Sequence, residues 1–175
     1  NKPEEDEVTE VNNEQCSKEE EVKIELTPLN YQIIEYCKLI SLSEQQKQNM
    51  SKTISIFKNR MANAFPEWEV KLFGSFMQNT QTIYSDLDFV VIKSEDEYIT
   101  NERMLKNIRN VLHSSREWKE IKYIPASVPI IKATCKSTGI HVDISVNRSN
   151  VVEAAEIIKN KLDTYPHLRT FMKVM

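Results

Sequence analysis

Two aspartates, Asp86 and Asp88, form the chemically most informative pattern in this sequence. They stand one residue apart where an apolar run, Leu87 to Ile92, predicts a β-strand. Alternate residues of a strand project to the same face, so the two carboxylates are expected to lie side by side. Carboxylate oxygens are the ligands that hard divalent cations such as Mg²⁺ take in proteins. The pair therefore predicts part of a metal site.

A third acid, Asp143, lies inside a second apolar run, Ile140 to Val146, that also predicts a strand. A carboxylate in such a strand costs energy unless it is paired or bound to a cation, so Asp143 is expected to complete the metal site. Two divalent cations about 4 Å apart stabilise the attacking and leaving oxygens of an in-line phosphoryl displacement. Asp143 is also suited to accept the proton of an attacking 3′-hydroxyl. Together the three acids predict nucleotidyl transfer.

Glycine is scarce, with only Gly74 and Gly139 in 175 residues. Because glycine has no Cβ, backbone N–H groups at Gly74 can approach a triphosphate closely, and the hydroxyl of Ser75 can donate to it. We therefore expect Gly74 and Ser75 to contact the phosphates. Gly139 is expected to form the turn that presents the strand of Asp143.

The elements that position these residues follow from the spacing of apolar side chains. Two N-terminal helices are predicted, the first begun by Thr27 and Pro28 and the second begun by Ser43 and stopped by Pro66. Further helices are expected at about 100–113 and 151–162, and strands at about 68–72, 87–92, 118–123, 128–134 and 140–146. Strands mixed with helices predict a single α+β or α/β domain.

Composition restricts the class of protein. With 40% apolar and 28% charged residues, the chain lies in the range of soluble globular proteins. No run approaches the ~18 apolar residues of a membrane span, and no signal peptide is evident. The three cysteines, Cys16, Cys37 and Cys135, are far apart, which favours a reducing compartment over a disulfide framework or a zinc site.

Charge is divided unevenly along the chain. Residues 1–25 contain ten acids and three bases, whereas the rest of the chain is net basic. The acidic run predicts a disordered tail, either without function or masking a basic surface. A basic stretch follows later and predicts either contacts to an RNA backbone or a solvated helix face: Arg103, Lys106, Arg109, Arg116, Lys119 and Lys122. His141 shares a strand face with Asp143 and is expected either to touch the site or to be an ordinary satisfied or exposed histidine.

Three motifs carry a family resemblance: Leu72–Phe76 with Gly74–Ser75, Ser85–Val91 with Asp86 and Asp88, and Gly139–Ser145 with Asp143. They resemble the polymerase-beta-type nucleotidyltransferase superfamily. Within it, the chain is similar to the non-canonical poly(A) polymerases of the nuclear TRAMP complex, also called the DNA polymerase sigma family. The similarity extends over about residues 28–175 and includes Val128–Lys132, Asn150–Ala155 and Leu162–Arg169.

The resemblance implies an α+β palm, a mixed β-sheet flanked by helices, with Asp86, Asp88 and Asp143 as catalytic residues and metal ligands. Gly74, Ser75 and Ser85 would bind the nucleotide. The cofactors implied are Mg²⁺ or Mn²⁺, with ATP as the substrate and the RNA 3′ end as the acceptor of AMP. The implied location is the nucleus, with a zinc-knuckle RNA-binding protein and an RNA helicase as partners and no membrane.

Charge and apolar spacing predict an acidic tail (1–26) and N-terminal helices (27–66). The resemblance implies that a nucleotidyltransferase palm (67–163) and the start of a truncated helical domain (164–175) follow. We expect the isolated chain to fold as a palm with little activity of its own. Asn79 and Thr82–Ile83 stand where the family often has Gly or Asp and Leu-Pro, so the loop over the nucleotide is expected to be shaped differently.

Three alternatives remain open at this point. A terminal uridylyltransferase would use the same chemistry with UTP. A metal-dependent glycosyltransferase would explain Asp86 and Asp88, but it requires neither the upstream Gly-Ser nor the third aspartate. A non-catalytic module that binds RNA or a partner would have no need to keep three like charges together.

Overall fold

The computed structural model of the chain describes residues 27–93 and 98–174. The acidic tail expected at residues 1–26 lies outside the described residues, and its prediction stays a prediction. In the described ranges, none of the helices has both the length and the apolar character needed to cross a membrane.

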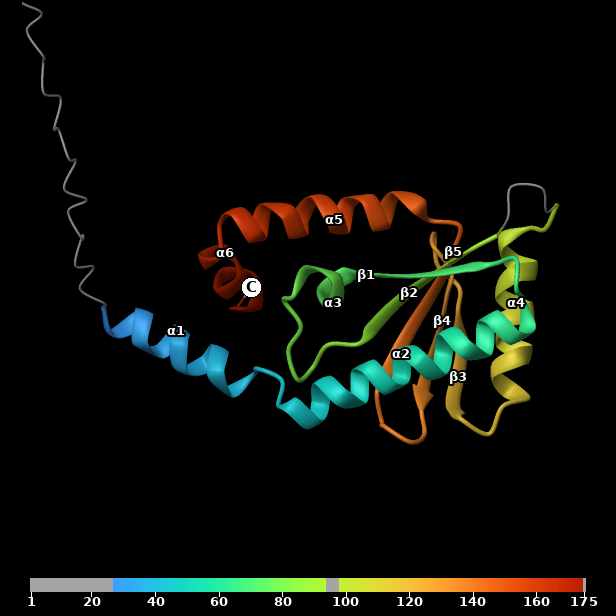
Figure 1. Ribbon diagram of the computed structural model, residues 1–175, viewed down its shortest axis with the longest axis horizontal. Coiled ribbons are helices and arrows are strands. Elements are labelled where there is room, and N and C mark those ends of the chain that lie inside the picture. Colours follow the sequence, from blue (N-terminus) through green and yellow to red (C-terminus); the bar gives the residue numbers. More distant parts are fainter. Residues whose placement is uncertain (1–26, 94–97, 175) are drawn as a thin grey trace, which may run out of the picture.

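The centre of the molecule is a mixed five-stranded sheet in the order β1-β2-β5-β4-β3 (Figure 1). Strands β2 and β5 are parallel, and the other neighbours are antiparallel. The strands are β1 (Glu69–Phe73), β2 (Leu87–Ile92), β3 (Trp118–Ile124), β4 (Ile130–Cys135) and β5 (His141–Val146). All five lie close to the predicted ranges, and the mixed sheet flanked by helices confirms the predicted fold class.

Helices surround the sheet: α1 (Pro28–Leu39), α2 (Glu44–Ala64), α3 (Gly74–Gln78), α4 (Asn101–His113), α5 (Ser149–Thr164) and α6 (His167–Val174). Helix α2 begins with a capping box, in which the Ser43 hydroxyl accepts from the Gln46 N–H and the Gln46 side chain accepts from the Ser43 N–H. Helix α3 was not expected, because five residues beginning with glycine give no helical period.

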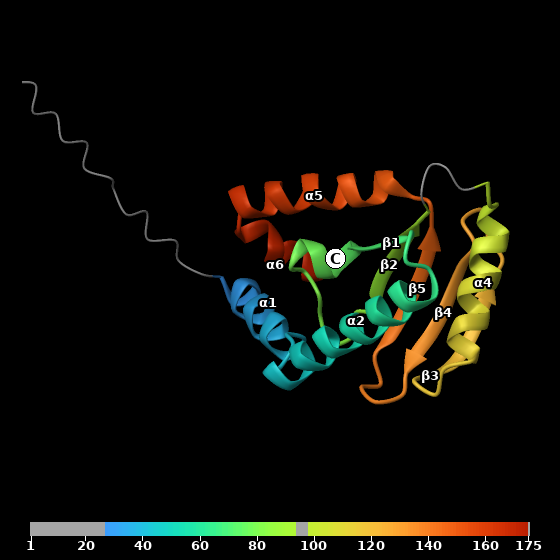
Figure 2. The same ribbon diagram turned by 45° about the vertical axis from the view of Figure 1, so that its right-hand side comes forward.

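The core lies between one face of the sheet and helices α2 and α4 (Figure 2). The ring of Phe57 from α2 is fully buried, 4.4 Å from the ring of Phe89 on β2 and 5.8 Å from that of Trp118 on β3. Trp68 stacks on Phe65 at 4.0 Å, and both Trp68 and Trp118 are buried. Since strand side chains alternate, the polar residues of β2, β4 and β5 lie on the opposite face.

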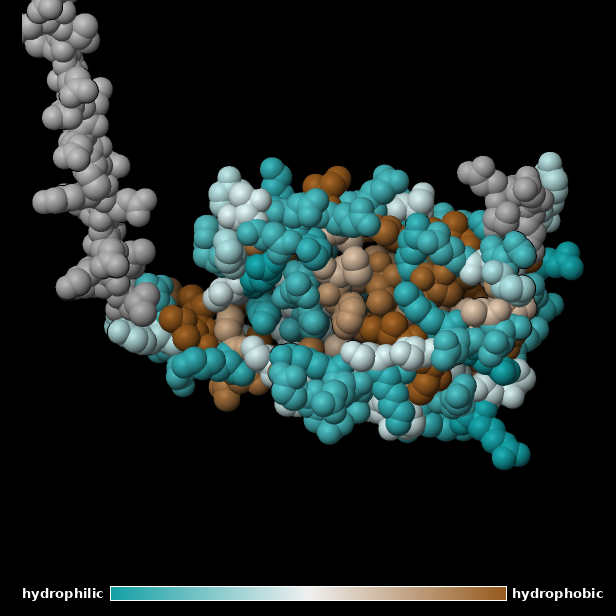
Figure 3. All heavy atoms as spheres, viewed as in Figure 1, coloured by the Kyte–Doolittle hydropathy of each residue, from teal (hydrophilic) through white to brown (hydrophobic). Residues whose placement is uncertain are grey.

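The first and last helices of the described chain lie side by side. Helix α6 packs on α1, where the Cys37 thiol lies 3.9 Å from the carbonyl oxygen of Thr170, and α5 runs along α3 and β1 (Figures 1 and 2). Helix α1 nevertheless exposes large apolar side chains, including Leu29 and Leu39. Figure 3 shows hydrophobic, brown surface in the region of α1. The described helices before residue 67 thus pack against the rest of the described chain, α1 through α6 and α2 through β1 and α4.

Candidate active site

The pairing of three strands brings the predicted acids together. In the parallel pair β2–β5, Asp88 lies directly opposite Asp143, and in the antiparallel pair β4–β5, Asp143 lies directly opposite Lys132. Asp86 is two residues before Asp88, just outside β2. We call Asp86, Asp88 and Asp143 the acidic cluster. Its position on the polar face is fixed by the same alternation that buries Leu87 and Phe89 in the core.

Lys132 lies within the acidic cluster, a role that the sequence did not suggest. Its Nζ donates hydrogen bonds to both carboxylate oxygens of Asp143, at 2.8 and 2.6 Å, and lies 3.8 Å from Oδ2 of Asp86. The hydrogen bond to Asp143 raises the pKa of the Lys132 ammonium, so it is protonated at neutral pH. In the sequence, Lys132 is only a single lysine in the apolar run of β4. Its role depends on the pairing register between β4 and β5, which the sequence alone does not reveal.

The surroundings of Asp88 disfavour its ionised form. Burial is the largest factor that raises its pKa from 3.8 to about 6, followed by the negative charges of Asp143 and Asp86, while Lys132 lowers it. Burial and like charges both disfavour an ionised carboxylate. A cation bound beside Asp88 would relieve both effects.

Gly74 has two structural reasons to be glycine besides the predicted one. Its φ of +65° lies in the left-handed region that favours glycine, and a Cβ there would come within 2.2 Å of Oδ2 of Asp88. The missing side chain therefore makes room for the Asp88 carboxylate. Gly74 also begins α3, and Ser75 follows it, so the first N–H groups of this helix lack intrahelical partners. Contact of Gly74 and Ser75 with phosphates stays a prediction.

The loop between α3 and β2 is shaped by residues that depart from the family pattern. Asn79 ends α3 with a φ of 55°, a conformation that asparagine tolerates better than most residues. The hydroxyl of Ser85 accepts a hydrogen bond from the Thr82 N–H at 2.9 Å, and the Ile83 N–H donates to the Ile40 carbonyl at 2.9 Å. Ser85 thus stabilises the turn before Asp86, and its predicted contact with the nucleotide is untested.

A cavity of about 200 Å³ opens beside the acidic cluster and is lined by Asp86, Asp143, Lys132, Lys122, Glu120, Thr134 and His141, among others. The Thr134 hydroxyl donates to Glu120 at 2.9 Å, and this hydrogen bond lowers the pKa of Glu120. Because that hydroxyl has one proton, Nδ1 of His141, 2.9 Å away, is the donor in their contact. His141 therefore has a hydrogen-bond partner in Thr134 and also lines the cavity.

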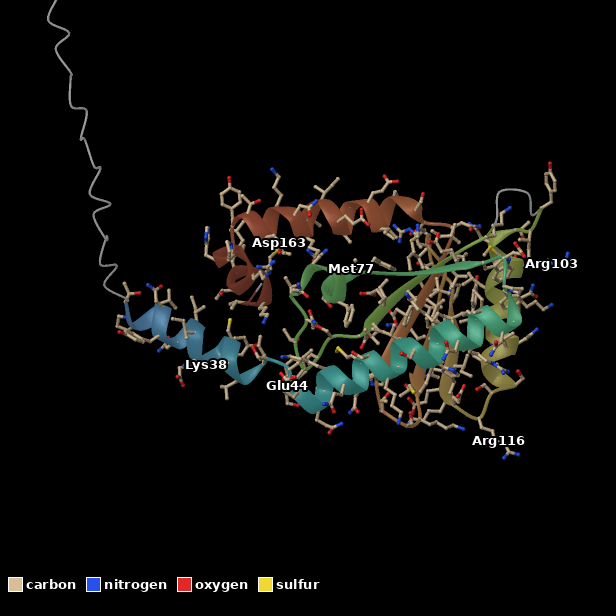
Figure 4. All side chains as sticks on the ribbon, in the orientation of Figure 1. Lys38, Glu44, Met77, Arg103, Arg116 and Asp163 are labelled. Atoms are coloured by element: carbon tan, nitrogen blue, oxygen red, sulfur yellow. The ribbon has the colours of Figure 1, made fainter. Side chains whose placement is uncertain are left out.

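The predicted basic stretch is divided by the sheet. Lys122 lines the cavity beside the acidic cluster, whereas Arg103, Lys106 and Arg109 line hollows along α4, which packs on the other face. Figure 4 shows Arg103 and Arg116 near the two ends of α4, on the outside of the molecule. The basic residues therefore do not form one continuous surface. Of these residues, Lys122 lines the cavity beside the acidic cluster.

The acidic cluster supplies the donors that a hard divalent cation prefers, because all its ligating atoms are carboxylate oxygens. Within residues 27–93 and 98–174, however, no three His, Cys, Asp or Glu side chains converge closely enough to form a ready metal site. The Lys132 ammonium supplies positive charge between Asp143 and Asp86. The donor set fits Mg²⁺ or Mn²⁺ once Asp143 is released from Lys132.

Comparisons with known proteins identify relatives of this chain. Poly(A) RNA polymerase protein 2 of Saccharomyces cerevisiae is 30% identical over 171 residues, which cover 93% of this chain and 27% of the relative. The Drosophila melanogaster protein named inactive non-canonical poly(A) RNA polymerase protein Trf4-2 is 30% identical over 115 residues, covering 63% of this chain and 27% of the relative. The chain thus spans about a quarter of the length of these relatives.

Among solved structures, the polymerase core of TRAMP, an RNA surveillance complex, superposes with a TM-score of 0.70 and 29% identity, covering 82% of this chain and 45% of that one. This likeness confirms the predicted nucleotidyltransferase palm. The family described as poly(A) RNA polymerase, mitochondrial-like, central palm domain, matches residues 29–161. The match includes both strands of the acidic cluster and argues against the glycosyltransferase alternative. The chain therefore belongs to the poly(A) RNA polymerase central palm family.

Proposed function

We propose that the protein containing this chain adds AMP from ATP to RNA 3′ ends without a template. The observation that carries the proposal is the register of β2 and β5, which sets Asp88 opposite Asp143 with Asp86 two residues away. Gly74, at the start of α3, lies beside the Asp88 carboxylate, and Ser75 follows it. Family membership and the similarity to poly(A) RNA polymerases support adenylate as the transferred group.

In the proposed reaction, the 3′-oxygen of the RNA forms a bond to the α-phosphorus of ATP, and the bond from that phosphorus to the bridging oxygen breaks. Asp143 accepts the proton of the 3′-hydroxyl, and pyrophosphate leaves with the electron pair of the broken bond. Gly74 and Ser75 orient the triphosphate, and Ser85 holds the turn before Asp86. When bound, Mg²⁺ or Mn²⁺ held by Asp86, Asp88 and Asp143 would neutralise phosphate charge in a two-metal arrangement.

We also propose that the RNA substrates belong to nuclear RNA surveillance. The support is the 29% identity to the polymerase core of TRAMP, which is described as an RNA surveillance complex. A zinc-knuckle RNA-binding protein and an RNA helicase are the partners that this assignment implies. Co-purification of the tagged full-length protein from nuclear extract, followed by mass spectrometry, tests both partners. Recovery from the cytoplasm without either would contradict this part of the proposal.

Primer extension tests the transfer reaction and the base choice together. The full-length protein is incubated with a 5′-labelled RNA primer, MgCl₂ or MnCl₂, and one of the four NTPs at a time. Tails formed with ATP well above those formed with UTP support the proposal. Tails formed chiefly with UTP would assign a terminal uridylyltransferase instead, and no extension with any NTP would favour the non-catalytic alternative.

A further inference from the structure

The Lys132 ammonium lies among the carboxylates of the acidic cluster, where a bound cation would be expected. Its Nζ contacts both oxygens of Asp143 within 2.8 Å and lies 3.8 Å from Asp86, so one positive charge bridges two members of the acidic cluster. The contact is set by the backbone, because Lys132 and Asp143 are direct partners in the antiparallel pair β4–β5. Cross-strand partners have Cβ atoms about 5 Å apart, which holds the two side chains within reach.

The acidic cluster needs such a charge when no metal is bound. Asp88 lies opposite Asp143 on the neighbouring strand, with Asp86 two residues away, and carboxylates at this spacing repel one another unless a cation compensates them. Truncating Lys132 would leave Asp143, whose side chain is only 20% exposed, without its partner.

The two partners differ in their freedom to move. The Lys132 side chain is 46% exposed, so its long flexible stem can carry the ammonium into solvent, whereas the shorter and more enclosed Asp143 stays with the backbone of β5. A divalent cation that binds Asp143 must approach the oxygens that already accept from Lys132, and the two positive charges repel each other. Binding of the metal and the Lys132–Asp143 contact therefore oppose one another.

We propose that Lys132 is a resident counter-ion, which neutralises Asp143 and Asp86 in the metal-free protein and competes with the divalent cation for Asp143. The inference rests on the proposed function for the identity of the metal site. It makes Lys132 a positioning residue that sets how tightly the metal binds and keeps the acidic cluster assembled before the metal arrives.

Calorimetric titration of MnCl₂ into the full-length protein tests this inference. Lys132→Met keeps the length of the side chain without its charge, so Mn²⁺ is expected to bind roughly three- to tenfold more tightly than to the wild type. Lys132→Arg keeps the charge and is expected to lie nearer the wild type. Lys136→Met, in the turn after β4, is the matched control and should change the Kd less than about twofold.

Thermal unfolding supplies a second measurement on the same proteins. Without metal, Lys132→Met is expected to melt at a lower temperature than the wild type, and MnCl₂ should raise its melting temperature more than that of the wild type. If Lys132→Met is unfolded without metal, circular dichroism should show folding as MnCl₂ is added. Failure of MnCl₂ to stabilise this variant more than the wild type would contradict the proposal.

Unchanged or weaker Mn²⁺ binding by Lys132→Met would overturn the counter-ion role, and would do so even if the enzyme transfers nucleotides. Conversely, a wild-type protein that transfers no nucleotide would overturn the proposed function and leave the competition measurable, because the competition is read from binding and unfolding. The two proposals therefore fail separately.

Discussion

At the scale of single residues, a comparison of Gly74 with Gly139 distinguishes the effect of backbone strain from an effect on the site itself. Both have positive φ, +65° at Gly74 and +75° at Gly139, but a Cβ at Gly74 meets the Asp88 carboxylate whereas one at Gly139 meets nothing within 4 Å. An alanine at either position has the same left-handed strain of about 1–2 kcal/mol. The steric displacement of Asp88 is specific to Gly74.

Gly74→Ala is therefore expected to lower nucleotide transfer by at least about tenfold, since small displacements at a reacting centre are costly. Gly139→Ala is the matched control, with a similar loss of stability and transfer within about threefold of the wild type. Primer extension and thermal unfolding of both variants measure the comparison. Equal losses of transfer would show that strain alone explains the requirement for glycine.

Asp88 is expected to lower the stability of the metal-free protein. Its pKa is raised from 3.8 to about 6 on folding, so the folded state loses stability as pH rises through this window and the full loss is present above pH 6. Asp88→Asn should raise the free energy of unfolding by about 1–2 kcal/mol at pH 8, allowing for solvent screening.

The stabilising effect of Asp88→Asn should become small near pH 4, where the carboxyl group is protonated in the folded state and partly protonated in the unfolded state. Urea unfolding at pH 4 and pH 8 in the presence of EDTA measures this difference. A destabilised Asp88→Asn protein at pH 8 would contradict the electrostatic description of the acidic cluster.

At the scale of elements, the site depends on helix α2 supporting the strand that carries Asp88. Phe57 on α2 packs against Phe89, the residue after Asp88, and is fully buried. Phe57→Ala should lower the free energy of unfolding by about 3–5 kcal/mol, as expected for a buried phenylalanine. Ile157→Ala on the exposed surface of α5 is the control, expected within about 0.5 kcal/mol. Chemical denaturation of both variants checks the prediction, and similar losses would contradict it.

A comparison of the expected and observed helices and strands shows how much of the structure the sequence could predict. Strands β2 and β5 were predicted almost to the residue, because apolar runs interrupted by single acids are unambiguous. Helix α3 and the left-handed conformation of Glu120 within β3 give no periodic signal. The register that joins β2, β5 and β4 depends on tertiary pairing, so the sequence could not show that Lys132 faces Asp143.

At the scale of the whole molecule, the chain corresponds in length to only part of its relatives. It spans 27% of the yeast relative, and large apolar side chains are exposed on α1, α5 and α6, including Leu39, Ile157 and Phe171. Exposed apolar patches often mark contact surfaces. The described residues contain the acidic cluster and the Gly74–Ser75 start of α3.

Residues 1–175 alone are therefore expected to be folded but nearly inactive. Circular dichroism should show cooperative unfolding, and primer extension should give at most about 1% of the full-length rate, a loss of roughly 3 kcal/mol of transition-state binding. Robust tailing by the isolated chain would show that the palm is sufficient for activity and would contradict this expectation.

In the proposed function, the acidic cluster performs the transfer of AMP to RNA. The most direct measurement is the rate of ATP-dependent primer extension by the full-length protein with Asp86→Asn and Asp88→Asn combined, compared with the wild type at the same Mg²⁺ concentration. Because the substitutions keep the shape of the side chains and remove the charges that would hold the metal, we expect a loss of about a thousandfold or more in a folded protein. Extension at the wild-type rate would contradict it.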